Sequence, residues 1–143
     1  MQKGDIIPGL PAHTLKLALT WRATDKLRLG ADVQAFSGQY ARGNENNQHQ
    51  ADNVEFFGSG RLPGYGILSL NGTLDLGAGW EIFANINNVF DKGYGTAAAL
   101  AENPFNSAGA FQNSSANWTH ETFLAPGAPR AAWIGVRFRF GKT

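Results

Sequence analysis

Residues 13–22 read HTLKLALTWR, and residues 27–37 read LRLGADVQAFS. In both segments large apolar side chains alternate with polar or small ones, as the three leucines of LKLALTW illustrate. A period of two residues indicates a β-strand with one apolar face and one polar face. Only the short polar stretch 23–26 separates the two segments, so they predict an antiparallel hairpin.

The same alternation returns three times further along the chain. It covers residues 65–76, 80–88 and 131–140. The stretches 38–61 and 89–130 are rich in Asn, Gln, Gly, Pro and Ser and show no sustained period, so we expect long polar loops there. The sequence therefore predicts an all-β fold, an antiparallel up-and-down meander of about five strands whose connections are alternately short and long.

Composition excludes several classes of protein. Gly accounts for 18 of the 143 residues, and charged residues make up 16%, whereas ~7% Gly and ~25% charged residues are usual. This balance argues against a helix bundle or a coiled coil. Without cysteine the chain has no disulfide framework and no thiolate metal site. A net charge of +1 without a basic block argues against nucleic-acid binding.

Strand length and connection pattern favour a membrane barrel over a soluble β-fold. A mean hydropathy of −0.26 excludes a transmembrane helix but not a barrel, whose strands alternate. The expected strands match the ~9–11 residues that cross a bilayer as a tilted strand. Short turns alternating with long loops are typical of outer-membrane barrels. Trp21 and Trp80 beside the short turns, with Phe140 at the chain end, fit an interfacial aromatic girdle.

Under this interpretation the two faces of the sheet meet different surroundings. We expect the following residues to face lipid: Leu15, Leu17, Leu19, Leu68, Leu70, Leu74, Ile82, Ile86, Ile134, Val136 and Phe138. We expect the following residues to face the lumen of the barrel: Lys16, Asp32, Asn71, Asn85 and Arg137. A soluble sandwich also separates apolar from polar side chains, so alternation alone does not distinguish the two folds.

A series of short motifs runs through the chain in a fixed order. They are IPGLPAH at 7–13, GQY and GNE within 38–45, RLPGY at 61–65, NNVFDKGYG at 87–95 and PGAPR at 126–130. NNVFDKGYG resembles the N-[LV]-F-[DN]-[KR]-x-Y pattern near the C-terminus of TonB-dependent outer-membrane receptors. The other motifs are similar to segments that lead into or out of late barrel strands in that family. The resemblance covers nearly the whole chain.

The resemblance implies a function and a set of partners. In this family a barrel of about 22 strands surrounds an N-terminal plug domain, and a short segment of the plug contacts TonB. Such receptors lie in the bacterial outer membrane and import iron–siderophore complexes or similar scarce nutrients. The implied partners are outer-membrane lipid, the remainder of the barrel, the plug, TonB through the plug, and the iron chelate. Val136, Phe138 and Phe140 fit a terminal barrel-assembly signal.

The number of strands suggests part of a larger barrel. At ~4.8 Å per strand, about five strands make a sheet too narrow to close, and lipid does not tolerate unpaired edges. The N-terminal sequence MQKGDIIPGLP lacks the features of an export signal. We therefore expect the C-terminal portion of a receptor barrel, without its plug. The alternative is a small self-contained β-protein, either a soluble binding module or a homo-oligomeric barrel.

The sequence assigns no catalytic, cofactor-binding or metal-binding residue. His13, His49 and His120 lie far apart without the spacing of metal ligands. No pair of carboxylates is placed by one regular element for acid–base catalysis. We therefore expect neither an enzyme nor a bound cofactor, and the residues that contact an imported ligand stay unassigned.

Overall fold

The chain is built almost entirely of β-strands. A computed structural model describes residues 3–48 and 58–141, so that His49 lies outside the described residues. The elements are β1 (Thr14–Arg22), β2 (Leu27–Phe36), β3 (Gln39–Tyr40), β4 (Arg61–Leu62), β5 (Tyr65–Gly77), β6 (Trp80–Asn87), β7 (Gly95–Asn103), the 3-10 helix η1 (Ser115–Asn117), β8 (Thr119–Pro126) and β9 (Ala131–Phe138). They fall into two compact units. No helix within the described ranges has the length and apolar character needed to span a membrane.

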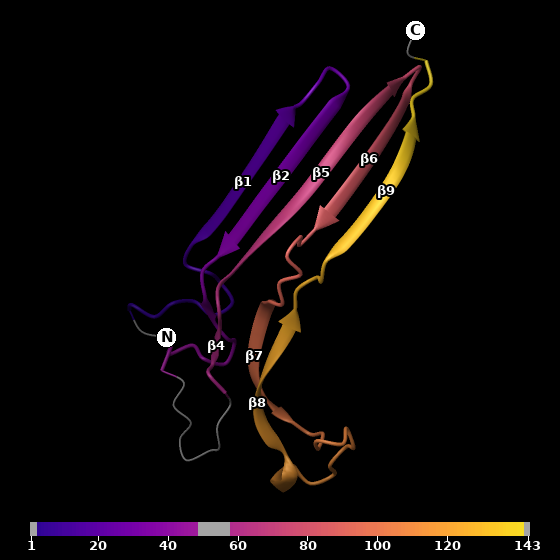
Figure 1. Cartoon of the computed structure of the whole chain (residues 1–143). Coiled ribbons are helices and arrows are strands. Elements are labelled where there is room, and N and C mark those ends of the chain that lie inside the picture. The colour runs from indigo at the N-terminus through magenta and orange to yellow at the C-terminus, as the bar shows by residue number, and fades with distance from the viewer. Residues whose placement is uncertain (1–2, 49–57, 142–143) are drawn as a thin grey trace. The chain divides into compact units, whose positions relative to one another are not determined.

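One unit is a single five-stranded sheet. Its strands follow the order β1-β2-β5-β6-β9, and every neighbouring pair is antiparallel. Each strand lies beside the next sheet strand along the chain, which makes an up-and-down meander (Figure 1). The predicted all-β meander is therefore confirmed, and each strand ends within two residues of its expected bounds.

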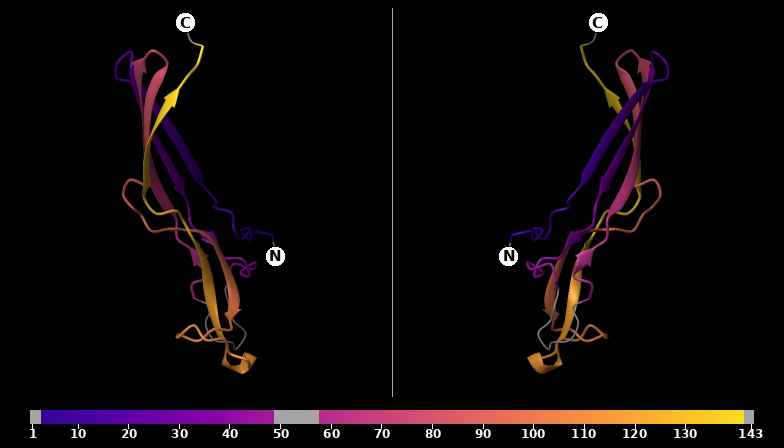
Figure 2. Two further views of the ribbon diagram at one scale, coloured as in Figure 1. Left: turned by 90° about the vertical axis from the view of Figure 1, so that its right-hand side faces the viewer. Right: turned by 90° about the vertical axis from the view of Figure 1, so that its left-hand side faces the viewer.

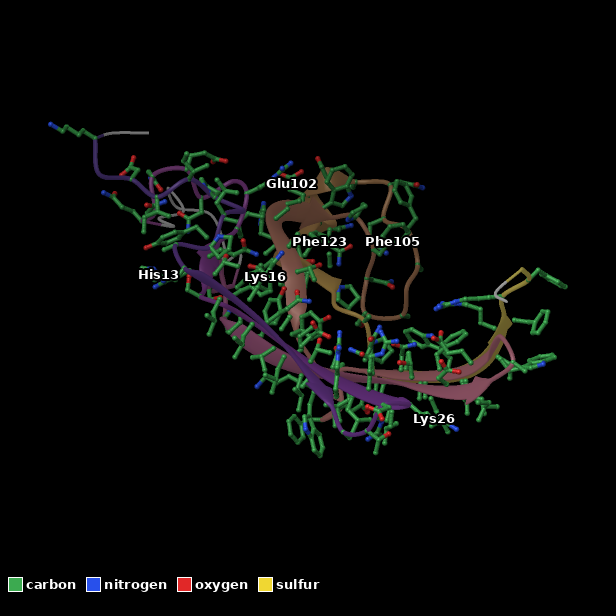
Figure 3. The ribbon with its side chains drawn as sticks, turned by 90° about the horizontal axis from the view of Figure 1, so that it is seen from above. His13, Lys16, Lys26, Glu102, Phe105 and Phe123 are labelled. Atoms are coloured by element: carbon green, nitrogen blue, oxygen red, sulfur yellow. The ribbon has the colours of Figure 1, made fainter. Side chains whose placement is uncertain are left out.

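The register places the two classes of side chain on opposite faces of this sheet. Paired residues of neighbouring strands point to the same side. One row across all the strands reads Leu19, Ala31, Leu70, Ile86 and Ala132. The adjacent row on the opposite face reads Thr20, Gly30, Asn71, Asn85 and Trp133. Side chains project from both sides of the curved sheet (Figure 3).

Within its own unit the sheet is one layer thick, as the side views show (Figure 2). On the apolar face Leu19 is 64% exposed, Val136 is 62% exposed and Ile134 is 75% exposed. Among the described residues the buried hydrophobic ones are Ala41, Leu62 and Ala98, and all three belong to the other unit. The apolar face therefore has no hydrophobic core of its own to bury it.

The other unit contains two small antiparallel sheets, β3-β4 and β7-β8. The expectation of an irregular loop over 89–130 is wrong in this part, because β7 and β8 form a hairpin within it. The β7 sequence GTAAALAEN places alanine on both faces, so it shows no alternation, and alanine has low strand propensity. Similarly, the short strand β3 lies inside the expected loop 38–61, and its partner β4 begins at the last residue of that loop.

A strand-like contact joins the two long connections inside this unit. The backbone N–H of Arg42 donates to the carbonyl of Ala98 at 2.9 Å, and the N–H of Leu100 donates to the carbonyl of Arg42 at 2.7 Å. Beside this contact, Leu100 packs on the small core. Both connections are therefore partly ordered by β-pairing, and polar composition alone does not determine their structure.

At the end of the sheet opposite the short turns, Asn88 organises the chain between β6 and β9. Its side-chain amide donates to the carbonyls of Lys92 at 3.0 Å and Ala128 at 3.1 Å, and its Oδ1 accepts the N–H of Lys92 at 2.9 Å. Asn88 is 2% exposed and adopts φ +49°, a conformation that Asn tolerates better than most residues. Asp91, also at positive φ, accepts the N–H of Arg130 at 2.8 Å.

We predict that Asn88→Ala lowers the free energy of unfolding by about 3 kcal/mol, because buried carbonyls lose their donors and Ala is strained at positive φ. Asn88→Gly relieves the strain and loses about 2 kcal/mol. Guanidinium unfolding in detergent micelles measures both. The control is Asn87→Ala at the neighbouring exposed residue, which changes stability by less than about 0.5 kcal/mol. Equal effects at both positions would contradict this role for Asn88.

Candidate functional site

The polar face of the five-stranded sheet is the candidate functional surface, and its chemistry changes along the strands. At the end near the long connections, the rings of Phe36 and Tyr65 pack at 5.0 Å between centroids. The middle carries amides and a carboxylate, where the Asn71 amide donates to Asp32 Oδ2 at 3.1 Å. The end near the short turns carries charged residues: Arg22, Arg28, Asp75, Glu81, Arg137 and Arg139.

Glu81 is the centre of the charged end. Arg137 donates through Nη1 to Oε1 of Glu81 at 3.0 Å, and Arg139 donates through Nη2 to Oε2 at 3.2 Å. The Glu81 side chain is only 10% exposed, whereas the two arginine side chains are about half exposed. The carboxylate is thus covered by its partners, while each guanidinium keeps contact with solvent. The contact joins β6 to β9 and to the residue that follows it.

At two places on this face, a large side chain of one strand lies over a glycine of the neighbouring strand. Asn71 of β5 lies over Gly30 of β2, and the ring of Phe83 of β6 lies over Gly135 of β9. A Cβ atom at either glycine would overlap the neighbouring side chain. The guanidinium of Arg137 also lies 5.4 Å from the centre of the Phe83 ring, a cation–π contact. These contacts order side chains on a face that has no hydrophobic core.

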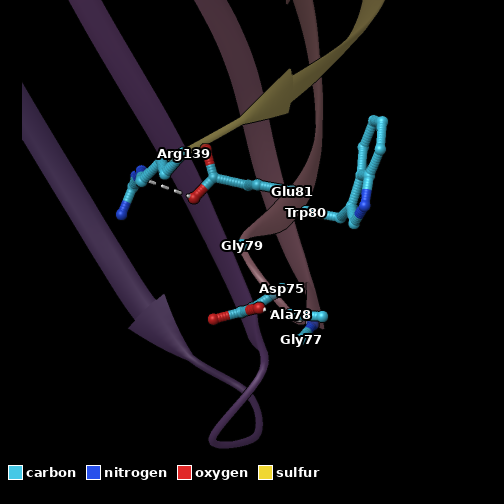
Figure 4. A pocket seen from close by; sticks show the side chains of 7 residues that line it. All are labelled: Asp75, Gly77, Ala78, Gly79, Trp80, Glu81 and Arg139. Atoms are coloured by element: carbon cyan, nitrogen blue, oxygen red, sulfur yellow. Dashed lines mark hydrogen bonds and ion pairs between the residues drawn. The ribbon is translucent and has the colours of Figure 1, made fainter. Parts of the chain in front are cut away.

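A pocket of about 350 Å³ lies at the β5–β6 turn. It is lined by Asp75, Gly77, Ala78, Gly79, Trp80, Glu81 and Arg139 (Figure 4). Ala78 and Gly79 both have positive φ, the requirement of a type I′ hairpin turn. Asp75 Oδ1 accepts the N–H of Gly77 at 2.8 Å, so this carboxylate supports the turn. The lining is charged and mostly polar, which suits a hydrated surface better than an apolar ligand.

The structure groups the sequence-predicted residues as expected. The eleven residues predicted to face lipid share the apolar face, and the five predicted to face the lumen share the polar face. What each face meets stays a prediction. Sequence reasoning missed Glu81 and Asn88 as contact centres, since both arginines of Glu81 lie 56 and 58 residues away and Ala128 lies 40 residues from Asn88. His13 and His120 belong to the same unit, and His120 Nε2 is 3.6 Å from Glu102 Oε1.

Comparison with known proteins gives a consistent result. Residues 2–89 match a family model described as TonB dependent receptor-like, beta-barrel. The ferric enterobactin receptor of Pseudomonas aeruginosa is 32% identical over 91 residues, which cover 64% of this chain. The chain spans only 12% of the length of that relative.

Solved structures are similar in fold. The siderophore receptor PiuA from Acinetobacter baumannii matches 92% of this chain and 14% of its own, with a TM-score of 0.64 and 18% identity. The match to the ferric-catecholate import receptor Fiu from E. coli, in its open form, covers 90% of this chain and 15% of the Fiu chain, with a TM-score of 0.59 and 17% identity. The match to a mutant of the ferric enterobactin receptor of P. aeruginosa, in complex with enterobactin, covers 90% of this chain and 16% of the receptor chain, with a TM-score of 0.58 and 23% identity.

The arrangement around Glu81 predicts that removing the carboxylate and removing the two guanidinium groups lower the free energy of unfolding by different amounts. Glu81→Gln leaves exposed guanidinium groups that water solvates, and it lowers the free energy of unfolding by about 1 kcal/mol. The double variant Arg137→Gln and Arg139→Gln leaves a covered carboxylate without its partners, and it lowers this free energy by about 3 kcal/mol.

Chemical unfolding at neutral pH measures both variants. Lys16→Gln is the control, because it removes a charge from the same face and forms no ion pair with the described residues. It changes stability by less than about 0.5 kcal/mol. If Glu81→Gln destabilises the protein as much as the double variant, the carboxylate is not the covered member of the cluster.

Proposed function

Because the chain belongs to the family of TonB-dependent receptor-like β-barrels, we propose that it forms part of the barrel wall of a bacterial outer-membrane receptor that imports iron–siderophore complexes or a similar scarce nutrient. The observation that carries this proposal is the single-layer sheet with one continuous apolar face. Because the barrel is a passive wall in such a receptor, the proposed activity is transport and includes no catalytic step.

The apolar face meets lipid in this proposal. Strands β1 and β2 contain 9 and 10 residues, which suits the ~9–11 residues of a tilted membrane-crossing strand. At the end with the short turns, the Trp80 and Phe138 rings pack at 4.7 Å between centroids, and the Trp21 side chain is 61% exposed. Amphipathic rings at this level suit the headgroup region of a bilayer. The alternating Val136, Phe138 and Phe140 fit an assembly signal.

The two edge strands of the sheet, β1 and β9, each have one side without a paired strand in the described sheet. In the described sheet β1 pairs only with β2, and β9 pairs only with β6. Unpaired backbone N–H and C=O groups are costly in hydrocarbon, because no water is present to satisfy them. We therefore propose that strands outside this chain pair with both edges and close the barrel. The plug domain inside that barrel, and TonB through the plug, are the further partners in this proposal.

The polar face lines the water-filled interior of the proposed barrel. Its amides, hydroxyls and ion pairs are groups that water solvates well, and they suit a lumen better than a lipid contact. The similar receptors bear the names ferric enterobactin receptor, siderophore receptor and ferric-catecholate import receptor. We propose a ferric catecholate siderophore as the first ligand to test.

A charge on the apolar face distinguishes lipid from water as its surroundings. Leu19 and Thr20 are neighbours near the middle of β1 and point to opposite faces. In phospholipid vesicles Leu19→Arg lowers the free energy of unfolding of the complete receptor by about 2 kcal/mol, because Leu19 lies between the bilayer midplane and the level of Trp21. The matched control, Thr20→Arg, costs less than about 1 kcal/mol because its guanidinium reaches water. Guanidinium unfolding measures both, and equal costs would contradict a lipid-facing Leu19.

Uptake tests the activity itself. The complete receptor containing this chain is expressed in a bacterium that lacks its own catecholate-siderophore receptors. We expect uptake of radioactive iron supplied as ferric enterobactin, and we expect this uptake to vanish when TonB is deleted. A ferric hydroxamate siderophore is the control for ligand class. If the receptor is inserted in the outer membrane and imports neither iron chelate, the proposed siderophore uptake is wrong.

A further inference from the structure

Two arginines face each other at the charged end of the polar face. Arg22 of β1 and Arg28 of β2 are direct partners in the strand register, so they point to the same side of the sheet. Both are exposed. Directly opposed residues of an antiparallel pair have Cβ atoms ~4.5–5.5 Å apart, and like charges in this arrangement repel each other. The repulsion requires a counter-charge if both side chains are to lie over the sheet.

Among the described residues, no carboxylate forms an ion pair with either arginine. Neither Arg22 nor Arg28 forms an ion pair or a side-chain hydrogen bond with any described residue. The two carboxylates on this end of the polar face are otherwise engaged, since Glu81 binds two arginines and Asp75 supports the β5–β6 turn. Asp25 of the β1–β2 turn lines the same pocket as both arginines, but its single negative charge still leaves a net charge of +1 there.

The arginine pair borders a pocket. This pocket has a volume of about 440 Å³ and is lined by Arg22, Ala23, Thr24, Asp25 and Arg28. Thr24 Oγ1 accepts the N–H groups of Lys26 at 3.2 Å and Leu27 at 2.9 Å, so the turn beside the pocket is held in one conformation. Two guanidinium groups beside a space larger than a small anion can donate several hydrogen bonds to one ligand.

We propose that Arg22 and Arg28 form a binding site for a small soluble oxyanion, a phosphate or a carboxylate. The pair lies on the face opposite the exposed leucines, so a phospholipid headgroup at the apolar surface does not reach it. That soluble anions reach this site from a water-filled lumen rests on the proposed function. The pairing of Arg22 with Arg28 does not depend on it. Asp25 lines the same pocket and weakens the site by charge repulsion.

Titration of the complete receptor in uncharged detergent at low ionic strength tests the site. One arm uses inorganic phosphate, followed by phosphorus NMR, and the other uses succinate, followed by calorimetry. We expect saturable binding in at least one arm, and the better ligand identifies the source of the oxyanion. Arg22→Gln and Arg28→Gln each weaken binding about tenfold, because each removes charge-assisted hydrogen bonds. Arg28→Lys keeps the charge and loses less.

Two controls keep these outcomes specific. Lys16→Gln removes one positive charge from the same face at the far end of β1, and it leaves the affinity within about twofold. Asp25→Asn removes the carboxylate that lines the pocket, and it tightens binding about threefold. The proposal is overturned if neither anion binds, or if binding survives in the double variant Arg22→Gln and Arg28→Gln. If the Leu19 and Thr20 variants still behave asymmetrically, the proposed barrel stands without this site.

Discussion

A sheet one layer thick must find partners for its apolar face outside itself. Full burial of a leucine, isoleucine or phenylalanine side chain contributes roughly 1.5–3 kcal/mol, and in a soluble sandwich a second sheet provides that burial. Here the apolar face of β1, β2, β5, β6 and β9 has no second layer within its unit, and residues such as Ile134 remain mostly exposed. The stability of the sheet therefore depends on surroundings that are themselves apolar, which is the condition that a lipid bilayer meets.

The polar face helps to fix how the strands pair. In a sandwich, interlocking side chains between the layers help to set the register, but this sheet has no such layer within its unit. Contacts between neighbouring strands on the polar face help to set the register instead. Asn71 fills the space above Gly30, the Phe83 ring fills the space above Gly135, and Glu81 holds two arginines at β9. Asn88 adds a buried hydrogen-bond centre at the opposite end.

The sequence predicts the sheet well because leucine, isoleucine and valine recur at alternate positions of its strands, although a few rings, such as that of Phe83, lie on the polar face. The same rule fails at β7, where AAALA offers no contrast between the faces, and the β7–β8 hairpin was expected to be irregular. Long-range contacts are a different limitation. The motif NNVFDKGYG singles out the region of Asn88, yet nothing in a linear pattern states that its amide reaches Ala128 or that Glu81 reaches Arg139. Those partners become visible only when the register is known.

The few charged residues of the five-stranded sheet occupy a restricted part of it. On the five-stranded sheet the charges lie on one face, and most of them gather at its short-turn end. A slip of one residue between β6 and β9 would carry Arg137 to the apolar face and Val136 to the polar face. The same slip would separate Arg137 from Glu81. The hydrophobic alternation and the ion pair therefore select the same register, so the pattern that predicts the strands also brings the charged cluster together.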